Sequence, residues 1–473
     1  MNAKIDKFVN CKFGIAMDKY CNSVWYIITI GAICVLCHSL NIPVTGAAFM
    51  TILVVIPLIF CKNSFTLVPF ALMCSFVLSE ETNPPSDYYT PWKLVLLCVL
   101  LAVALAALLF NLIFYGKWRL LFRRTYLTVS LCIVVAFLIT AGWFSPFFRL
   151  SGFGTAIAIA ATMFAPYSMI VNCGEYEGKK TVKYFTWTLI VAAAAIVLCM
   201  LKHFAVNDFD FSNAKNILKL GFVGPNTGAA LITLSIPMTF YLIYEYKHGY
   251  LFFLLVAFEL GAIFLSQSRA SLVIALPGTL IVAIALCFKK KSGRLGYYIT
   301  FGIFVLAFIV IAIVFRHKIT ELFKALFVDG FTGNGRTMLW KLGFEHWLDN
   351  PIFGSGFWIL RIINPVQFWY YSFHCTPLTY LYCGGLVAFV AYVYHRYKTV
   401  RLVFSAKLTP ERVFIALTVL AMLCNAMIDI AMTSPAYIIY YSIMLAIIEC
   451  DVNKIKSERK LLSPDNTITE SVK

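Results

Sequence analysis

Charged residues are scarce in this chain of 473 residues: Asp, Glu, Lys and Arg make up only 13% of it. A soluble globular domain carries about 25%. The shortage argues against an ordinary soluble enzyme, because so few charges cannot cover a water-facing surface. The sequence also lacks an HExxH zinc motif, a Walker phosphate loop and a GxGxxG turn with strand context. We therefore expect neither a metal ion nor a nucleotide cofactor.

Apolar residues are abundant instead: 61% of the chain is hydrophobic, and the mean hydropathy is +0.83. Runs of about 17–25 apolar residues are long enough to cross a bilayer as helices. Fourteen such segments can be drawn, some of them short, so the sequence predicts an all-α polytopic membrane protein with about 12–14 transmembrane helices. The predicted spans are 24–42, 44–60, 64–79, 93–115, 125–143, 152–171, 184–201, 225–245, 250–266, 270–288, 297–315, 374–394, 412–432 and 435–450.

The basic residues follow the positive-inside rule if the N-terminus is cytoplasmic. With that orientation, 27 of the 39 Lys and Arg lie in cytoplasmic segments or at their edges, and the acidic EETNPPSD loop lies outside. The net charge of +17 is then a topology signal, and we expect no nucleic-acid partner. The predicted organisation is a cytoplasmic segment 1–23, helices 1–11 over 24–315 with an outer loop 202–224, a large periplasmic or extracellular loop 316–373, helices 12–14 over 374–450, and a cytoplasmic, disordered tail 451–473.

Arg269 stands in the stretch FLSQSRASL, between two apolar runs. The predicted topology places it at the short outer turn between helices nine and ten. Two interpretations stay open. The side chain is either an interfacial arginine that snorkels to water, or a guanidinium in a protein cavity that binds phosphate with two parallel hydrogen bonds.

A second arginine, Arg336, lies in the large loop just after Gly333-Asn334-Gly335. The spacing predicts a short helix over 337–348, ended by Asp349-Asn350-Pro351. Its apolar face would lie on the membrane surface; that face comprises Trp340, Phe344, Trp347 and Leu348. Arg336 is then either an ordinary surface charge or, beside the free N–H groups of a helix start, part of an anion site. We expect Trp340 to contribute to substrate binding.

Two polar residues stand at other predicted outer helix starts. His374 lies at the outer mouth of helix twelve, and Asn226 follows Gly224-Pro225 at the start of helix eight. Asn226 is a candidate for helix capping or for a ligand contact. His374 alone would be a hydrogen-bonded structural residue. Together with Arg269 and Arg336, its imidazole suits a diphosphate leaving group and a hydroxyl nucleophile.

A transporter or lipid-linked glycan flippase is the alternative function. Glu259 and Asp429 lie inside predicted spans, where we expect structural hydrogen bonding but where transport residues also occur. Pro237 and Pro277 are possible helix breaks. No internal repeat supports this alternative, and the functional-looking cations gather at one face rather than at the midplane.

Several of these stretches, in their order and spacing, resemble the O-antigen ligase and O-antigen polymerase superfamily of bacterial membrane proteins. They are SQSRASL, GNGRTMLW followed by NPIFGSGF, and FHCTPLTYLYCGGL, preceded by the similar GPNTGAALI. The resemblance covers roughly residues 220–390. It implies a GT-C-like fold in the bacterial plasma membrane, and the positive-inside rule predicts that both termini are cytoplasmic.

The resemblance also implies a chemistry. An inverting, metal-independent glycosyltransferase of this kind would move a glycan from an undecaprenyl-diphosphate donor to a hydroxyl of a glycan or lipid acceptor at the outer face. A chain-length regulator or a flippase would be possible partners. Arg269 and Arg336 match the diphosphate-binding arginines of the family, and His374 matches its essential histidine. Cys375 stands where the family often has Asn. Polymerase and ligase share the donor site, so both remain open.

Overall fold

The computed structural model describes residues 8–78, 90–145, 148, 150–210, 214–290, 292–317, 320, 336–357, 360–364, 367–370, 373–428 and 434–461. Within this part of the chain the regular structure is helical, apart from one two-stranded antiparallel hairpin. The predicted all-α fold of a polytopic membrane protein is confirmed.

Ten helices of the described residues are long and apolar enough to cross a bilayer. They are α4 (Pro43–Phe60), α7 (Pro91–Phe114), α10 (Leu150–Cys173), α11 (Lys179–Val206), α13 (Pro225–Glu245), α15 (Arg269–Lys289), α16 (Arg294–Val314), α19 (Thr376–Val403), α20 (Pro410–Ile428) and α21 (Pro435–Leu461). An eleventh span arises if α2 (Lys12–Cys21) and α3 (Val24–Ser39), which are bent by 71° at their junction, are taken together.

Three shorter apolar helices complete the set: Ser64–Val77, α9 (Thr128–Ile139) and Gly249–Leu265, which contains α14 (Phe253–Leu265). Each of the fourteen predicted spans falls on one of these helical segments. The count of full spans is lower because hydropathy also counts apolar turn residues. The predicted span 125–143, for example, shrinks to the 12 residues of α9, which is about 18 Å of helix against a hydrocarbon core of about 30 Å.

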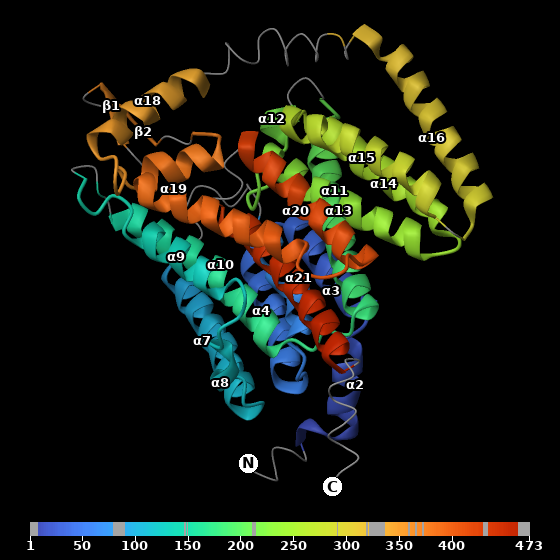
Figure 1. Ribbon diagram of the computed structural model, residues 1–473, viewed down its shortest axis with the longest axis horizontal. Helices are drawn as coiled ribbons and strands as arrows, with labels where there is room; N and C mark the ends of the chain where they lie inside the picture. The colour runs from blue at the N-terminus through green and yellow to red at the C-terminus, as the bar shows by residue number, and fades with distance from the viewer. Residues whose placement is uncertain are drawn as a thin grey trace.

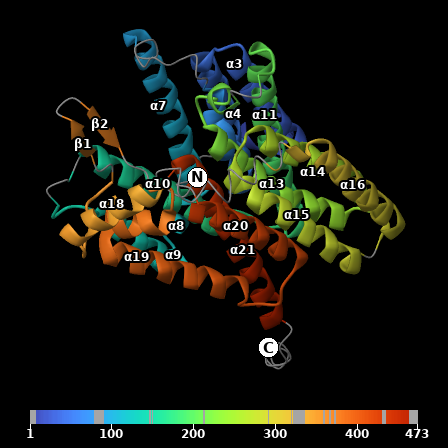
Figure 2. The same cartoon turned by 90° about the horizontal axis from the view of Figure 1, so that it is seen from above.

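Helix α13 is the central helix of the bundle. In its most apolar 18-residue stretch, 89% of the residues are buried, and the helix contacts α11, α14, α15 and α20. Figures 1 and 2 both place it near the middle of the molecule. Its hydroxyl side chains bond to the preceding helical turn, as Thr233 Oγ1 does to the Ala229 carbonyl at 2.9 Å, so they are satisfied without water. Helix α16 is the opposite case, buried over only 6% and standing at the periphery.

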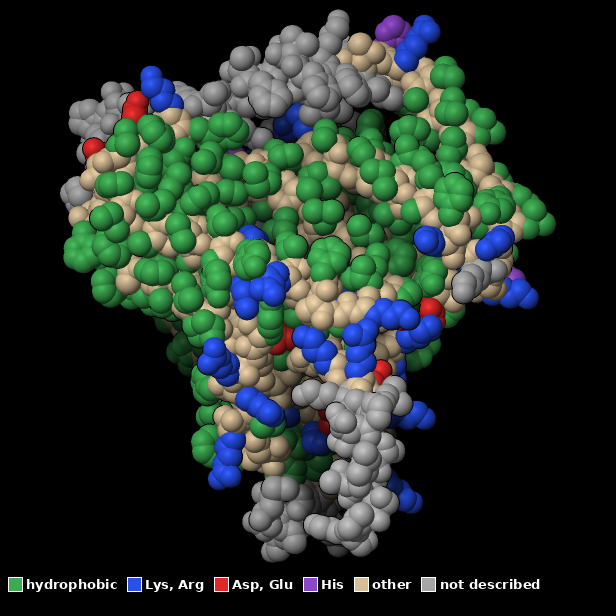
Figure 3. Space-filling model, in the orientation of Figure 1, with side chains coloured by type: hydrophobic (Ala, Val, Ile, Leu, Met, Phe, Trp, Pro, Cys, Tyr) green, Lys and Arg blue, Asp and Glu red, His purple; other side chains and the backbone are tan. Residues whose placement is uncertain are grey.

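The molecule has two distinct ends. At the top of Figure 1 lie α12 (Ala214–Ile217), α18 (Arg336–Asp349) and the hairpin of β1 (Leu360–Asn364) and β2 (Gln367–Tyr370). We call this end the loop face. Helix α2 and the last turns of α21 lie at the bottom, which we call the opposite face. Figure 3 shows Lys and Arg side chains gathered mostly over the lower, narrow part, with apolar side chains covering the broad part above. On this side of the molecule, positive charge is therefore concentrated away from the loop face.

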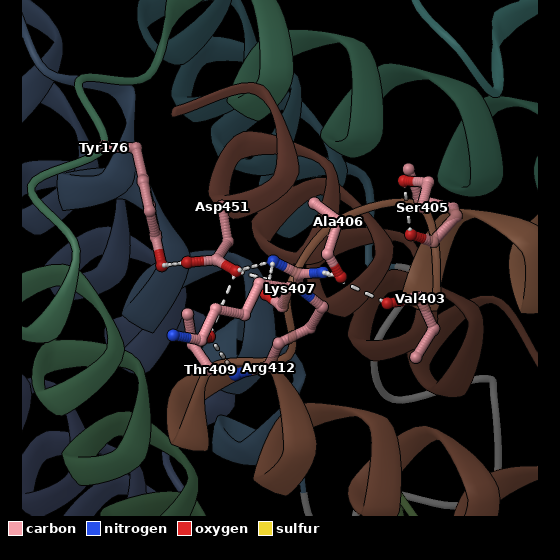
Figure 4. A network of polar contacts seen from close by, with 9 residues as sticks. Tyr176, Val403, Ser405, Ala406, Lys407, Thr409, Arg412 and Asp451 are labelled. Carbon is pink, nitrogen blue, oxygen red and sulfur yellow. Dashed lines mark hydrogen bonds and ion pairs between the residues drawn. The ribbon is translucent and has the colours of Figure 1, made fainter. Parts of the chain in front are cut away.

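Three helices are joined away from the loop face by one buried arginine (Figure 4). Arg412, near the start of α20, is 0% exposed, and both its Nε and Nη2 lie 2.8 Å from Oδ2 of Asp451 on α21. Its remaining N–H groups donate to carbonyls at and just after the end of α19, those of Val403, Ala406 and Lys407. The guanidinium therefore caps α19 while it anchors α20 to α21.

Candidate functional site

A serine-rich turn presents Arg269 at the first position of α15. Ser266 and Ser268 are buried, and the Ser268 backbone N–H donates to Ser266 Oγ at 3.2 Å. Ser268 Oγ then donates to Ser271 Oγ at 3.2 Å, and Ser271 Oγ donates to Oδ1 of Asn425 on α20 at 3.3 Å. The turn between α14 and α15 is thus fixed by buried side-chain hydrogen bonds to a third helix. Arg269 itself is half-buried.

Asn226 and Arg269 lie in the first turns of neighbouring helices that run in the same direction. Helix α14 connects α13 to α15 in the sequence and runs in the opposite direction to both. Helices α13 and α15 also contact each other directly. Pro225 takes the first position of α13, as the sequence predicts, but the cap residue is Gly224 and not Asn226. Capping by Asn226 was therefore the wrong expectation. The half-buried amide of Asn226 lies one position inside the helix, at the end of the bundle where Arg269 begins α15.

The backbone of His374 adopts a left-handed conformation, with φ at 47°. The residue lies between two buried neighbours, Phe373 and Cys375, and is itself half-buried. Cys375 is the N-cap of α19, and its carbonyl accepts from both the backbone N–H and Oγ1 of Thr379 at 2.9 Å. The Cys375 side chain makes no cap hydrogen bond, and burial raises the pKa of its thiol. A thiolate nucleophile at this position is therefore disfavoured.

Helix α18 is attached to the turn that carries His374. Trp340 Nε1 donates to the Phe373 carbonyl at 2.6 Å. Gly343 lies against α19 so closely that an added Cβ would be 2.2 Å from the Tyr382 ring. Arg336 is the first residue of α18 and precedes Trp340 by four residues, about 6 Å along the helix axis. The structure therefore brings the helix start at Arg336 to the turn at His374.

The helix predicted over 337–348 is confirmed, since α18 extends over Arg336–Asp349. The four residues of its predicted apolar face do not share one environment. Trp340 and Trp347 pack against the core, whereas Phe344 and Leu348 are 47% and 56% exposed. The indole N–H of Trp340 is used in holding the protein together, so any substrate contact would have to come from its ring.

A break in α19 holds the end of α18 in place. Gly385 interrupts the helix with φ at 71° and ψ at −171°. The segment 350–356 supplies the missing hydrogen bonds: the amides of Ser355 and Gly356 donate to the Tyr382 and Cys383 carbonyls at 3.0 and 2.8 Å. In return, the Leu386 amide donates to the Pro351 carbonyl at 2.9 Å. Backbone groups freed by a helix break are thus satisfied by protein instead of water.

Glycine is required where these segments meet. A Cβ on Gly385 would lie 2.1 Å from the Ile352 carbonyl oxygen, and one on Gly354 would lie 2.4 Å from that of Cys383. Gly142, in the turn after α9, would meet Gly356 at 2.5 Å, and its amide donates to the Phe353 carbonyl at 3.0 Å. The glycines in NPIFGSGF and YCGG therefore build a backbone junction between α9, α19 and the end of α18.

The acidic residues inside predicted spans have separate outcomes. Glu259 on α14 is 3% exposed and accepts a hydrogen bond from Thr239 Oγ1 on α13 at 3.2 Å, so it ties two helices together. Asp429 lies outside the described residues. Pro237 and Pro277 each lie inside a continuous helix. Among the described helices these two prolines therefore do not produce the breaks that the transporter alternative would use.

The loop after α11 carries two carboxylates that motif reasoning did not single out, Asp208 and Asp210. Both are exposed, and Asp208 and the intervening Phe209 have positive φ values of 50° and 54°. The described residues contain no group of three or more His, Cys, Asp or Glu that could hold a metal ion. The sequence signal that could have identified them is their spacing, because a single residue separates the two acids.

The helix starts at the loop face define the electrostatic character of the site. Helices α13, α15, α18 and α19 begin there, and a helix start carries partial positive charge and free N–H groups. Arg269 adds a full charge at one start, and Arg336 is the first residue of another. An end of a bundle built in this way favours a bound anion, and phosphate above all.

The fold and these helix starts define a multi-pass membrane protein with an anion-favouring end. Residues 251–393 match the family model described as O-Antigen ligase, a stretch that includes Arg269, α18 and His374. This match over part of the chain supports membership of the O-antigen ligase and polymerase superfamily, a surface-polysaccharide ligase and polymerase family. Neither curated proteins nor solved structures gave a match to the chain.

Proposed function

We propose that this protein is a glycosyltransferase that moves a glycan from an undecaprenyl-diphosphate donor to a hydroxyl acceptor, as a surface-polysaccharide polymerase or an O-antigen ligase. The reaction takes place at the loop face, which we assign to the outside of the bacterial plasma membrane. The observation that carries the proposal is the attachment of α18 to the His374 turn through Trp340 and Phe373. It supports the proposal because α18, which begins with Arg336, is bonded to the residue before His374 within the matched family region.

In the proposed reaction, Arg269 and Arg336 hold the two phosphates of the donor. The acceptor hydroxyl attacks C1 of the sugar from the side opposite the leaving group. The bond between C1 and the phosphate oxygen breaks, and undecaprenyl diphosphate leaves with the electron pair. His374 either takes the hydroxyl proton as the general base or binds the diphosphate as a third cation. Asn226 and the ring of Trp340 contact the substrate. The reaction uses no metal ion or cofactor.

The test uses purified full-length protein and a synthetic lipid-linked repeat unit as the only sugar source. We expect Arg269→Ala and Arg336→Ala to lower the rate of product formation by about 10²–10³-fold, the usual cost of losing one charge-stabilising donor. Arg→Lys at either position should restore little, since a point charge cannot reproduce the guanidinium fork. A matched control is Arg294→Ala, because Arg294 also begins an apolar helix, α16, but lies outside this site. Near-normal product from Arg269→Ala or Arg336→Ala would refute the proposed clamp.

The same assay separates the remaining alternatives. A ladder of products from the lone donor indicates a polymerase, whereas transfer only after a second acceptor is added indicates a ligase. A chelator arm tests metal independence directly, with Asp208 and Asp210 as the residues to replace if activity falls. Movement of the lipid-linked glycan across a vesicle membrane without bond formation would favour the flippase alternative.

A further inference from the structure

A cavity of about 440 Å³ lies away from the loop face, among elements that the glycosyl-transfer proposal does not use. It is bordered by the junction of α2 and α3, the turn after α4, the first turns of α11 and the residue after α13. The side chains used in the argument are Lys179, Lys180, Lys183, Trp187 and Tyr246.

The charge of this cavity is positive. Its lining holds three lysines from one end of α11 against a single acid, Glu177. Lys183 lies 4.6 Å over the ring of Tyr246, and both Lys179 and Lys183 approach Glu245 at the edge, at 3.0 and 3.4 Å. Glu245 thus faces two ammonium groups, and Lys180 pairs with Glu177 at 2.8 Å. Three ammonium groups therefore meet two carboxylates, and the cluster keeps a net positive charge. The first amides of the 28-residue α11 add the partial positive charge of a long helix start.

The cavity is also amphipathic along the direction of α11. Trp187 lies two turns deeper in the helix than Lys179 and Lys180, and its ring packs edge-on against Phe252. Val24 and Phe65 add further apolar wall. Among the described residues the indole N–H of Trp187 donates no hydrogen bond, although the side chain is half-buried. Interfacial tryptophans and lysines in this arrangement are typical of the headgroup level of a membrane.

We propose that this cavity binds an anionic phospholipid from the leaflet at the opposite face. The phosphate lies among Lys179, Lys180, Lys183 and the first amides of α11. The indole of Trp187 donates to the headgroup, and an acyl chain follows the apolar wall. A lipid is favoured over a soluble phosphate because the lining changes from lysine to apolar within two helical turns. The site does not depend on the proposed glycosyl transfer, and its test needs no sugar donor.

The test titrates the full-length protein in detergent with phosphatidylglycerol and, separately, with phosphatidylcholine, and reads bound lipid by native mass spectrometry. We expect Lys179→Gln/Lys183→Gln to weaken phosphatidylglycerol binding by about 30-fold, or about fivefold per lysine, with little effect on phosphatidylcholine. Lys398→Gln is the matched control, because Lys398 also lies over a tyrosine ring, that of Tyr126 at 4.0 Å, but does not line the cavity. It should bind like wild type.

Two further arms keep the proposal open to refutation. Trp187→Phe keeps an aromatic ring but removes the N–H together with the five-membered ring of the indole, so it should fold and bind phosphatidylglycerol about tenfold more weakly. Glycerol phosphate and inorganic phosphate, added at equal concentration, should not displace the lipid. Unchanged phosphatidylglycerol affinity in Trp187→Phe or in the lysine double variant would overturn the proposal. Displacement by either soluble phosphate would instead identify a soluble ligand and overturn the lipid assignment.

Discussion

The hydrogen bond from Trp340 to the Phe373 carbonyl can be removed with little change in shape. Trp340→Phe keeps an aromatic ring on α18 but deletes the N–H that reaches the turn before His374. If α18 must be docked for Arg336 to act with His374, this single bond influences catalysis without touching either residue. Trp340→Phe should therefore slow glycan transfer while the membrane bundle stays folded.

The size of the rate loss follows from the carbonyl that Trp340→Phe leaves without a donor. Phe373 is 2% exposed, and among the described residues its carbonyl has no second hydrogen-bond donor. A buried acceptor without a partner costs about 1–3 kcal/mol. That energy shifts the equilibrium between docked and undocked α18 by about 5- to 150-fold. The rate of product formation should fall by up to this factor, with the thermal unfolding midpoint almost unchanged.

The same helix provides the control. Trp347 Nε1 donates to the Pro351 carbonyl at 3.0 Å, but that carbonyl also accepts from the Leu386 amide and stays paired when the indole is lost. Trp347→Phe should therefore change the rate by about twofold or less. The assay is product formation from a purified lipid-linked repeat unit by each variant. Equal losses in both variants, or no loss in Trp340→Phe, would refute the positioning role.

Two further predictions concern stability, read as thermal unfolding midpoints in detergent. Arg412→Met leaves Asp451 buried without its cation and should lower the free energy of unfolding by about 3–5 kcal/mol. The double variant Arg412→Met/Asp451→Leu should unfold at a higher temperature than the single variant. A double variant that unfolds no later than the single would contradict the ion-pair account. Burial lowers the pKa of Lys117, which is 3% exposed and bonded to Ser64 and Asn111, to about 8 from 10.5. Between these two pKa values the unfolded chain binds more protons than the folded protein. Wild type should therefore gain stability relative to Lys117→Met as the pH rises from about 8 to 10.5. A stability difference between the two proteins that does not change with pH would contradict this account.

Much of the architecture can be predicted from hydropathy and from the Pro, Gly and Asn residues that start or end helices. Each apolar run became a helical segment, Pro225 marks the start of α13, and the Gly-Asn-Gly and Asp-Asn-Pro stretches bracket α18 closely. These features depend on residues near each other in the chain. Serines 266 and 268 likewise stand beside Arg269 for a local reason, because they satisfy the backbone of a very short turn.

The break in α19 could not be predicted in the same way. The stretch around Gly385 continues a helical apolar pattern, and glycine occurs often in membrane helices without breaking them. What stabilises the break is a set of hydrogen bonds from residues 350–356, about 30 positions earlier. The hydrogen bond of Trp340 could not be predicted for a similar reason, since its partner carbonyl lies 33 residues away. Non-local backbone pairing leaves no periodic signal in either segment.

These non-local bonds also bear on the departure from the family pattern at Cys375. If the side chain after the histidine had to orient the imidazole, cysteine would be a poor replacement for asparagine, because a thiol is a weak hydrogen-bond donor and acceptor. Here the turn is held through its backbone on both sides: the Phe373 carbonyl by Trp340, and the Cys375 carbonyl by Thr379. The left-handed φ of His374 is fixed between these two anchors. Cys375→Asn should therefore preserve the turn, and Cys375→Ala should keep most of the transfer rate. Thr379→Val should also change the rate by about twofold or less, because the Thr379 amide still donates to the Cys375 carbonyl.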